Sequence, residues 1–326
     1  MSASFVPALS AAREAAGAQH YPRGTLYIVA TPIGNLADIT LRALHVLEMV
    51  DAVACEDTRH TQQMLRAYGI ERRGAQLLAV HQHNEAEAAQ AVLARLQAGE
   101  RIAYVSDAGT PAVSDPGARL VATVRAAGAA VVPLPGASSV TTALSAAAVV
   151  AQGHDDGGFL FAGFLPTKAG ERATAVAALG AQPRAAVLLE APHRIEEMAR
   201  ALAVLGERPV TFARELTKQF EEIATVPAAG AAAWLAAGPQ RTRGEFVVVL
   251  HPAPSVAAEA GALSQGDART LRLLLAELPV KTAVRIAAEI TGAPRNTLYN
   301  AALALKREAG SDPDGDADGA PDDPAA

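Results

Sequence analysis

The 326-residue sequence predicts an α/β fold with two α/β domains, followed by a small helical module. Short runs of β-branched and apolar residues alternate with segments of helical length from residue 25 to residue 250, as in proteins that cover a largely parallel sheet with helices. Polar loops rich in Gly and Pro follow most of these runs. Hydrophobic residues make up 50% of the chain, which is enough for one large or two ordinary domains.

The first domain, residues 25–150, is expected to hold five strands joined by helices. Four of the helices follow a residue that can cap a helix start. These residues are Asp38, Asp57, Asn84 and Asp115, with each helix starting one residue later. Pro116 suits the first position of the helix after Asp115. The strands are expected at residues 26–30, 52–56, 77–80, 101–105 and 130–132.

The second domain, residues 158–251, follows a Gly- and Asp-rich segment, residues 151–158, which we interpret as a linker. Its sheet is expected to mix strand directions, and a helix is expected from Ile195 to Leu205. The strands are expected at residues 159–163, 185–190, 210–213 and 245–250.

The helical module, residues 266–308, ends in a hairpin of two helices with a further helix before them. The helices are expected at residues 267–277, 281–291 and 296–307. From Lys281 to Arg307 the chain carries five basic residues and one acidic residue, Glu289. A basic helical pair of this kind is compatible with nucleic-acid binding, and it is also typical of solvated helices, so both interpretations stay open.

The excess acidic charge is confined to the C-terminal end of the chain. The formal net charge is −6, and six Asp and no basic residues occur between Ser311 and Ala326. The rest of the chain balances 28 basic residues against the other 28 of the 34 acidic ones. Residues 309–326 are therefore expected to form a disordered acidic tail, and the low isoelectric point does not argue against an RNA partner.

The two other compositional features concern the N-terminus and the single cysteine. Residues 1–24 carry charges and no continuous apolar core, so we interpret them as a poorly ordered extension rather than a secretory signal. Cys55 alone cannot form a disulfide framework and favours a reducing, cytoplasmic compartment. No apolar run reaches the length of a membrane span, so no membrane association is predicted.

Common catalytic signatures are missing from the sequence. Neither the Gly-rich dinucleotide fingerprint nor the phosphate-binding loop with its Lys-Ser/Thr pair occurs. His81 and His83 have no cysteine cluster nearby, and no metal site is predicted. What remains is a set of strand-end loops rich in small and polar residues, which is typical of a site for a small cofactor. In the loop 106–117, Gly109 allows a positive φ and close approach of a ligand.

Eight short motifs along the chain carry a family resemblance. They lie at residues 31–36, 56–59, 106–111, 135–139, 161–166, 190–194, 214–218 and 244–248. In this order they resemble the tetrapyrrole-methylase superfamily, and specifically its ribosomal branch, which methylates the ribose 2′-hydroxyl of a decoding-centre cytidine in 16S rRNA. The resemblance runs from about Leu26 to Leu250, and the helical module also resembles that branch.

The resemblance implies a homodimer and a cofactor, S-adenosylmethionine, bound in a cleft between the two α/β domains. The chemistry agrees, since the carboxylate of Asp107 can favour a cationic sulfonium. The helix start at Ser138 offers N–H groups to a carboxylate such as that of methionine. The positions that match the cofactor motifs are Pro32, Ile33, Gly34, Asp107, Gly109, Thr110, Ser138 and Ser139.

The predicted function is transfer of a methyl group from S-adenosylmethionine to a ribose 2′-hydroxyl of 16S rRNA in the small ribosomal subunit. This in-line displacement needs alignment and removal of the hydroxyl proton, and it needs no metal. Glu190 and Glu215 are the candidates for deprotonating the hydroxyl. The candidates for holding RNA are Arg59, His193, Arg194, Arg214 and Lys218. For each of these charges, a purely structural role between the domains stays open.

Two other functions remain as alternatives. The first is a corrin or porphyrin C-methyltransferase of the same superfamily, and the loop 31–34 and the basic module argue against it. The second is a non-catalytic RNA-binding assembly factor, and the intact cofactor motifs argue against that interpretation. An assay that offers 30S subunits and a macrocycle as methyl acceptors distinguishes the predicted function from both alternatives.

Overall fold

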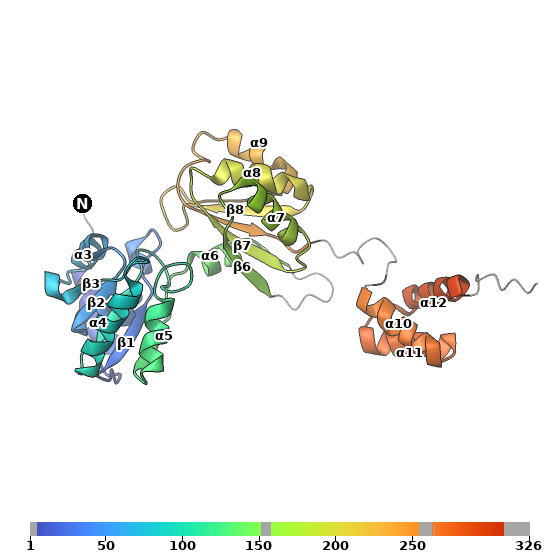
Figure 1. Ribbon diagram of the computed structural model, residues 1–326. Coiled ribbons are helices and arrows are strands. Elements are labelled where there is room, and N and C mark those ends of the chain that lie inside the picture. The colour runs from blue at the N-terminus through green and yellow to red at the C-terminus, as the bar shows by residue number, and fades with distance from the viewer. Residues whose placement is uncertain (1–4, 151–157, 254–262, 264, 310–326) are drawn as a thin grey trace, which may run out of the picture. The chain divides into compact units, whose positions relative to one another are not determined.

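The computed structural model describes residues 5–150, 158–253, 263 and 265–309 (Figure 1). The described residues form two compact units, one up to Ala253 and the other from residue 263 onward. Two of the expectations above lie outside the described residues. They are the linker, up to residue 157, and the acidic tail, from residue 310.

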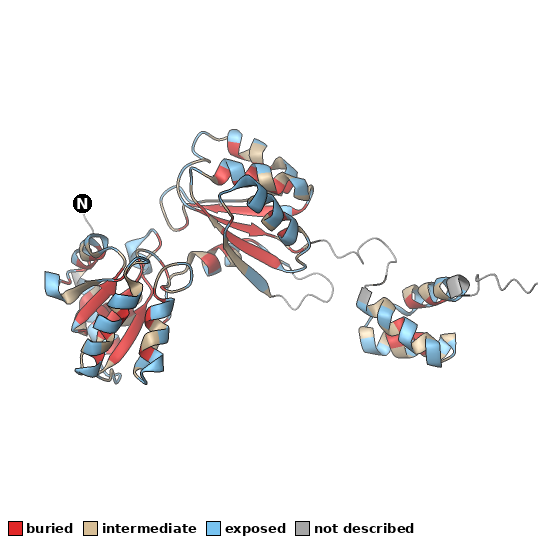
Figure 2. Cartoon of the chain, in the orientation of Figure 1, coloured by how far each residue is buried: buried red, intermediate tan, exposed pale blue. Residues whose placement is uncertain are grey.

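The first sheet is fully parallel, with strand order β3-β2-β4-β1-β5. Its strands are β1 (Thr25–Val29), β2 (Ala52–Cys55), β3 (Leu77–Ala79), β4 (Ile102–Val105) and β5 (Ala130–Leu134). The three central strands β1, β2 and β4 are buried along their whole length, as parallel strands with helices on both faces usually are (Figure 2). The prediction of a largely parallel sheet in this domain is confirmed.

Helices cover both faces of this sheet, and alternate residues of each strand serve the two faces. On one face Tyr27 and Val29 pack with side chains of α1, α2 and α3. On the other, Leu26 and Ile28 pack with side chains of α4 and α5. The helices are α1 (Val6–Ala16), α2 (Leu41–Met49), α3 (Thr58–Ala67), α4 (Glu85–Gln97), α5 (Ala118–Ala126) and α6 (Ser139–Ala146).

The expectation of a poorly ordered N-terminal extension is wrong for residues 5–24. Helix α1 packs on α2, and it buries Leu9, Ala12 and Ala16, which are spaced three and four residues apart. This spacing places the three side chains on one helical face. The absence of a continuous apolar run therefore does not prevent residues 6–16 from forming an Ala-rich amphipathic helix.

The expected helix start and cap agree with the structure at α3, only the start agrees at α4, and both differ at α2 and α5. Asp57 caps α3, with its Oδ1 accepting from the N–H groups of Arg59 at 2.7 Å and His60 at 3.2 Å. Asp38 does not cap α2, because it ends a short 3-10 turn, and Thr40 Oγ1 instead accepts from Ala43 N at 3.1 Å.

Helix α4 does begin after Asn84, but the Asn84 side chain accepts from His81 N at 2.8 Å and makes no cap bond. Asp115 does not cap α5, which begins two residues later than expected, after Gly117 at φ 125°. The carboxylate of Glu85 accepts from Gly117 N and Arg119 N, both at 2.9 Å. The cap of α5 thus comes from a residue 32 positions away in the chain, which local sequence cannot reveal.

The second sheet has the order β6-β7-β10-β8-β9 and mixed strand direction, as expected. Strand β6 runs parallel to β7, and the other neighbouring pairs are antiparallel. Its strands are β6 (Phe159–Phe164), β7 (Ala185–Glu190), β8 (Pro209–Arg214), β9 (Glu222–Pro227) and β10 (Phe246–Leu250). Strand β9 was not expected: it is an edge strand that alternates half-buried and exposed residues and offers no apolar run.

Helices α7 (Ala169–Gly180), α8 (Ile195–Leu202) and α9 (Ala231–Ala236) pack on one face of the second sheet. On the other face, Ile33 and helix α6 of the first domain pack against β7, β8 and β10. This shared cluster joins the two α/β domains. Short 3-10 turns lie at Leu36–Asp38, Gly74–Gln76, Ala203–Leu205 and Ala228–Gly230.

The second unit contains α10 (Gln265–Glu277), α11 (Val280–Thr291) and α12 (Arg295–Ala309). Its small core holds Leu271, Val284, Ala287, Leu298 and Ala302. Helix α11 ends at Gly292, whose φ of 72° suits a glycine after a helix. None of the helices in the described parts of the chain is long and apolar enough to cross a membrane.

Candidate active site

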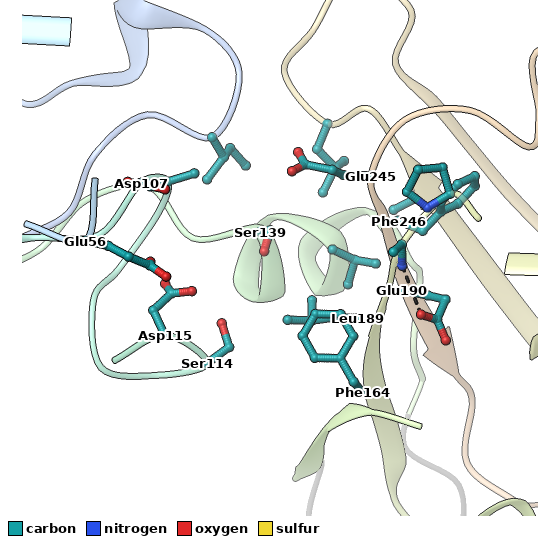
Figure 3. A pocket seen from close by; sticks show the side chains of 17 residues that line it. Glu56, Asp107, Ser114, Asp115, Ser139, Phe164, Leu189, Glu190, Glu245 and Phe246 are labelled. Carbon is teal, nitrogen blue, oxygen red and sulfur yellow. Dashed lines mark hydrogen bonds between the residues drawn. The ribbon is translucent and has the colours of Figure 1, made fainter. Parts of the chain in front are cut away.

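A cavity of 430 Å³ opens within the unit formed by the two α/β domains (Figure 3). Its volume falls in the range of small-molecule sites. From the first domain it is lined by residues that follow β1, β2 and β4 and by the first residue of α6: Ile33, Glu56, Asp107, Ala108, Ser114, Asp115 and Ser139. From the second it is lined by Phe164, Leu189, Glu190, Ala191, Pro192, Ala213, Leu216, Glu245, Phe246 and Val247.

The two domains contribute different chemistry to this cavity. The first domain supplies three carboxylates, from Glu56, Asp107 and Asp115. The second supplies mainly apolar side chains, among them Phe164 and Phe246, and Figure 3 shows them across the cavity from the carboxylates. We call the set Glu56, Asp107 and Asp115 the acidic wall. A flat, partly apolar ligand with a positive charge fits such a site.

The loops after β1 and β4 are fixed to each other by two backbone hydrogen bonds. Thr31 N donates to Gly109 O and Gly109 N to Thr31 O, both at 2.9 Å. Gly109 has a φ of 81°, and a Cβ there would lie 3.3 Å from Ile33 Cγ2. Thr110 Oγ1 donates to Ala137 O at 3.0 Å and so connects the loop after β4 to the loop before α6. Of the predicted cofactor residues, Gly109 and Thr110 therefore shape the loops from which Ile33 and Asp107 line the cavity.

Gly34 lies where the first loop approaches the second domain. A Cβ there would lie 2.5 Å from Lys218 Cγ and 2.9 Å from Thr217 Oγ1. Glycine is therefore required for this close approach. Pro32 precedes the cavity-lining Ile33, and Ser138 is the N-cap of α6 without a side-chain cap bond. Ser139, the first residue of α6, lines the cavity.

Glu190 lines the cavity, and its carboxylate is already engaged. Its Oε1 accepts from Ala191 N at 3.0 Å and pairs with Arg194 Nε at 3.2 Å. Arg194 also donates to the carbonyl of Leu165. Burial raises the pKa of Glu190, and the bond from Ala191 N and the charge of Arg194 oppose this rise. Both of these contacts of Arg194 therefore lie within the second domain.

Glu215 does not belong to the cavity lining. Its Oε1 accepts from Lys218 Nζ at 2.8 Å and from Glu245 N at 3.0 Å. Burial acts to raise the pKa of Glu215, but these two hydrogen bonds and the charge of Lys218 outweigh it, so the pKa is lowered. Lys218 Nζ also pairs with Glu245 Oε2 at 2.9 Å. This arrangement favours a structural role for Glu215 and Lys218 over proton transfer or RNA binding.

The remaining predicted RNA contacts divide into buried and exposed residues. Arg214 is only 6% exposed, and it donates to Phe220 O at 2.9 Å and lies 3.6 Å from the Glu222 carboxylate. The expectation that Arg214 holds a phosphate therefore disagrees with the structure, because its guanidinium is buried. Arg59 and His193 are exposed and lie outside the cavity lining.

Sequence reasoning assigned no chemical role to Glu56 or Asp115. Glu56 was quoted only within a family motif, and Asp115 was expected to cap a helix. A signal was present, because each follows a buried strand at the same edge of a parallel sheet, where ligands bind. Among the described residues, no group of His, Cys, Asp and Glu forms a metal-binding cluster, and Cys55 is buried with its pKa raised by burial to about 11.

The fold and the cavity define a class of protein: two α/β domains that enclose a ligand site at the carboxyl ends of a parallel sheet. A family model described as tetrapyrrole (corrin/porphyrin) methylases matches residues 25–232, and one described as the RsmI C-terminal HTH domain matches residues 262–306. The solved structure of cobalt precorrin-4 methyltransferase is similar in fold, with a TM-score of 0.51, 18% identity, and coverage of 71% of this chain and 98% of that one.

Sequence relatives are much closer. The ribosomal RNA small subunit methyltransferase I of Escherichia coli O157:H7 is 49% identical over 285 residues, which are 86% of this chain and 95% of that protein. The protein of the same name from Pseudomonas aeruginosa is 47% identical over 284 residues, 86% of this chain and 97% of that one. The chain therefore belongs to the tetrapyrrole methylase family, in the group of ribosomal RNA small subunit methyltransferases I. This membership confirms the predicted fold class and the predicted S-adenosylmethionine-dependent methyltransferase.

Proposed function

We propose that this methyltransferase modifies the ribose 2′-hydroxyl of a decoding-centre cytidine in 16S rRNA of the small ribosomal subunit. The observation that carries the proposal is similarity along nearly the whole chain, helical module included, to proteins named for methylating ribosomal RNA of the small subunit. A corrin or porphyrin methyltransferase is the less favoured alternative, because the solved structures of that kind resemble only the fold.

The cavity fits S-adenosylmethionine, which when bound supplies a methyl group on a cationic sulfonium. The acidic wall suits this charge. The N–H groups at the start of α6, beside Ser139, suit the donor's carboxylate. Apolar side chains of the second domain, such as Leu216 and Val247, suit an adenine ring. The proposed cofactor residues are Pro32, Ile33, Gly34, Asp107, Gly109, Thr110, Ser138 and Ser139.

The phosphates of the RNA are proposed to lie away from the acidic wall, because carboxylates repel phosphates. The candidate phosphate contacts are exposed Arg59 and His193 and the basic residues of the helical module. The homodimer implied by the family resemblance is part of the same proposal, and light scattering tests it. Because ribosomal subunits assemble in the cytoplasm, the proposed substrate also accounts for the predicted compartment.

The proposal is tested by incubating the protein with labelled S-adenosylmethionine and one of three acceptors: 30S subunits, extracted 16S rRNA, or a macrocyclic precursor. We expect label in the RNA and none in the macrocycle. Alkaline cleavage needs a free 2′-hydroxyl, so the product should resist cleavage at the labelled nucleotide. Normal cleavage at that nucleotide would contradict ribose methylation and favour a base atom.

The role of the helical module is tested by ending the chain at Glu259. No predicted cofactor residue lies beyond this point, so we expect unchanged binding of S-adenosylmethionine but poor methylation of 30S subunits. Loss of basic residues should also make RNA binding less dependent on salt. A control chain that lacks only residues 311–326 should bind at least as well as the full chain. Equal activity and equal salt dependence for the Glu259-terminated chain and the full chain would contradict a role in RNA binding.

A further inference from the structure

Two carboxylates of the acidic wall, those of Glu56 and Asp115, were given no chemical role by the sequence. Glu56 directly follows β2, and Asp115 lies in the loop between β4 and α5. Figure 3 shows their carboxylates pointing toward each other at the edge of the cavity, with Asp107 close by. Within the described parts of the chain, none of the three forms an ion pair with Lys, Arg or His. They therefore meet the cavity without a counter-ion from the protein.

The other cavity carboxylates differ in this respect. Glu190 is paired with Arg194, and Glu245 is paired with Lys218. A cation beside a carboxylate stabilises its ionised form and makes it a weaker proton acceptor. Among the described residues, Glu56, Asp107 and Asp115 are thus the acidic side chains of the lining whose basicity is not reduced by a paired cation.

The surroundings of Glu56 and Asp115 raise the pKa values of both carboxylates. Burial, and then the negative charges of Asp107, Asp115 and Asp57, raise the pKa of Glu56. Burial also raises the pKa of Asp115, with Asp107 adding to it, while a hydrogen bond from Ser106 opposes the rise. Neighbouring Tyr104 and Cys55 also have raised pKa values, so both remain neutral near pH 7 and add no charge. Arg59 and His60, at the start of α3, act on Asp57 and lower its pKa.

We propose that Glu56 accepts the proton of the substrate hydroxyl, and that the charge of Asp115 maintains the basicity of Glu56. This inference rests on the proposed function, because an O-methylation requires such an acceptor. The hydroxyl oxygen bonds to the methyl carbon while the carbon–sulfur bond breaks and leaves its electron pair on sulfur. The hydroxyl proton passes to Glu56 and from there to water.

Glu56 and Asp115 differ in a way that assigns these two roles. The negative charges of Asp107, Asp115 and Asp57 raise the pKa of Glu56, whereas the Ser106 hydroxyl favours the ionised form of Asp115. A charged Asp115 next to Glu56 keeps Glu56 a stronger base than an ordinary carboxylate. A carboxylate whose pKa is raised in this way accepts a proton more readily, which is what general-base catalysis requires.

The first test follows the carboxyl groups of the ligand-free protein by NMR with ¹³C-labelled Glu and Asp. We expect Glu56 to titrate above the ordinary carboxyl range and to move back toward it in Asp115→Asn. The exposed Glu87 on α4 provides a control, since Glu87→Gln should leave the Glu56 titration unchanged. Ordinary titration of Glu56, or titration that ignores Asp115→Asn, overturns the inference whatever the substrate is.

The second test measures single-turnover methyl transfer to 30S subunits at saturating S-adenosylmethionine over a pH series. We expect Glu56→Gln to lower the rate by about 10²- to 10⁴-fold, with calorimetric affinity for S-adenosylmethionine unchanged. In Asp115→Asn the midpoint of the rising limb should shift to lower pH, because a negative charge beside the base is lost. A wild-type rate in Glu56→Gln, or an unmoved midpoint in Asp115→Asn, overturns the inference.

The two tests separate this inference from the proposed function. If the wild-type protein labels no ribose 2′-hydroxyl, the proposed function fails, and the rate measurement fails with it. The titration of Glu56 then still decides whether the two carboxylates are coupled. If the ribose is labelled and Glu56→Gln is fully active, the proposed function stands and the assignment of Glu56 fails.

Discussion

Among the described residues, three acidic side chains of the N-terminal α/β domain line the cavity without an ion pair, whereas the charges of the C-terminal α/β domain beside the cavity are paired with residues of that domain. Glu190 is held by Arg194, and Glu215 by Lys218 and the N–H of Glu245. Each domain places charged residues directly after its strands. The two domains differ in whether another group of the protein pairs with these charged residues.

Strand direction explains this difference for Glu215, whereas Glu190 is paired with Arg194 within the connection from β7 to α8. In the first sheet all strands are parallel, so only strand ends and the loops after them meet at the cavity edge. In the second sheet, β10 runs antiparallel between β7 and β8, and its first residue, Phe246, is in register with Glu190 and Arg214. The start of β10 therefore brings Glu245 to the ends of its neighbours. In this sheet the antiparallel strand thus supplies partners for Glu215 and Lys218, and the parallel first sheet has no such strand at the cavity edge.

The largest effect is expected from removing a buried charge of the second domain that is purely structural. Arg208 is 4% exposed, and burial lowers its pKa to about 10. It donates to the carbonyls of His251 (2.7 Å), Leu179 (2.8 Å), Gly180 (3.0 Å) and Gln182 (3.1 Å). Arg208→Leu should lower the free energy of unfolding by about 3 kcal/mol or more, since buried acceptors lose a charged donor.

Fluorescence of Trp234 measures this loss in urea, because the single tryptophan lies in the second domain, stacked on Phe212. Arg200→Leu is the matched control, since Arg200 is 61% exposed and its pair with Glu196 spans 3.6 Å. The control should change the unfolding midpoint little. Equal midpoints for the two variants would mean that the buried charge of Arg208 does not stabilise this domain. The proposed difference between the two domains would then be contradicted.

The next effect concerns the loops of the first domain. Gly109→Val places a branched side chain at a φ of 81° and against Ile33. We expect the fold to remain cooperative and the affinity for S-adenosylmethionine to fall at least about ten-fold, because the loops that shape the cavity must move. Calorimetry measures the affinity.

The control for Gly109→Val is Gly128→Val, where φ is 77° and no atom lies within 4 Å of an added Cβ. It introduces the same kind of backbone strain away from the cavity. If both variants lose equal affinity, strain alone accounts for the effect. Unchanged affinity in Gly109→Val would place the cofactor elsewhere.

The sequence predicted most of the fold because most elements depend on local patterns. Strand β7 was expected at 185–190 and occupies those residues, and Asp57 caps α3 as expected. The errors arise where tertiary contacts decide. Helix α5 begins at a site capped by Glu85 of another helix, and α1 is stabilised by packing on α2.

The candidate site was predicted less completely than the fold, for a related reason. Motifs located the loops, and Ile33, Asp107, Ser139 and Glu190 do line the cavity. A sequence does not reveal which charges find partners after folding. Arg214 and Glu215 therefore looked like functional residues, although the antiparallel neighbour β10 and the loop before it engage Glu215 internally.

The smallest effect, and the sharpest test of the comparison, is expected for Glu215→Gln. The pKa of Glu215 is lowered in the folded protein, so its stabilisation is present above the pKa of the unfolded chain and is lost as the pH falls through the folded value. At neutral pH the variant should be less stable by about 1 kcal/mol, and this difference from the wild type should shrink on acidification. Urea unfolding at neutral and acidic pH, followed through Trp234, measures it.

Methyl transfer by Glu215→Gln decides between a structural and a catalytic Glu215. With Lys218 and the N–H of Glu245 as its partners, Glu215 should affect the single-turnover rate far less than Glu56 does. A loss of rate as large as that of Glu56→Gln, with stability unchanged at every pH, would make Glu215 the proton acceptor. Paired charges beside the antiparallel strand would then perform chemistry, and strand direction would not explain which carboxylates are available.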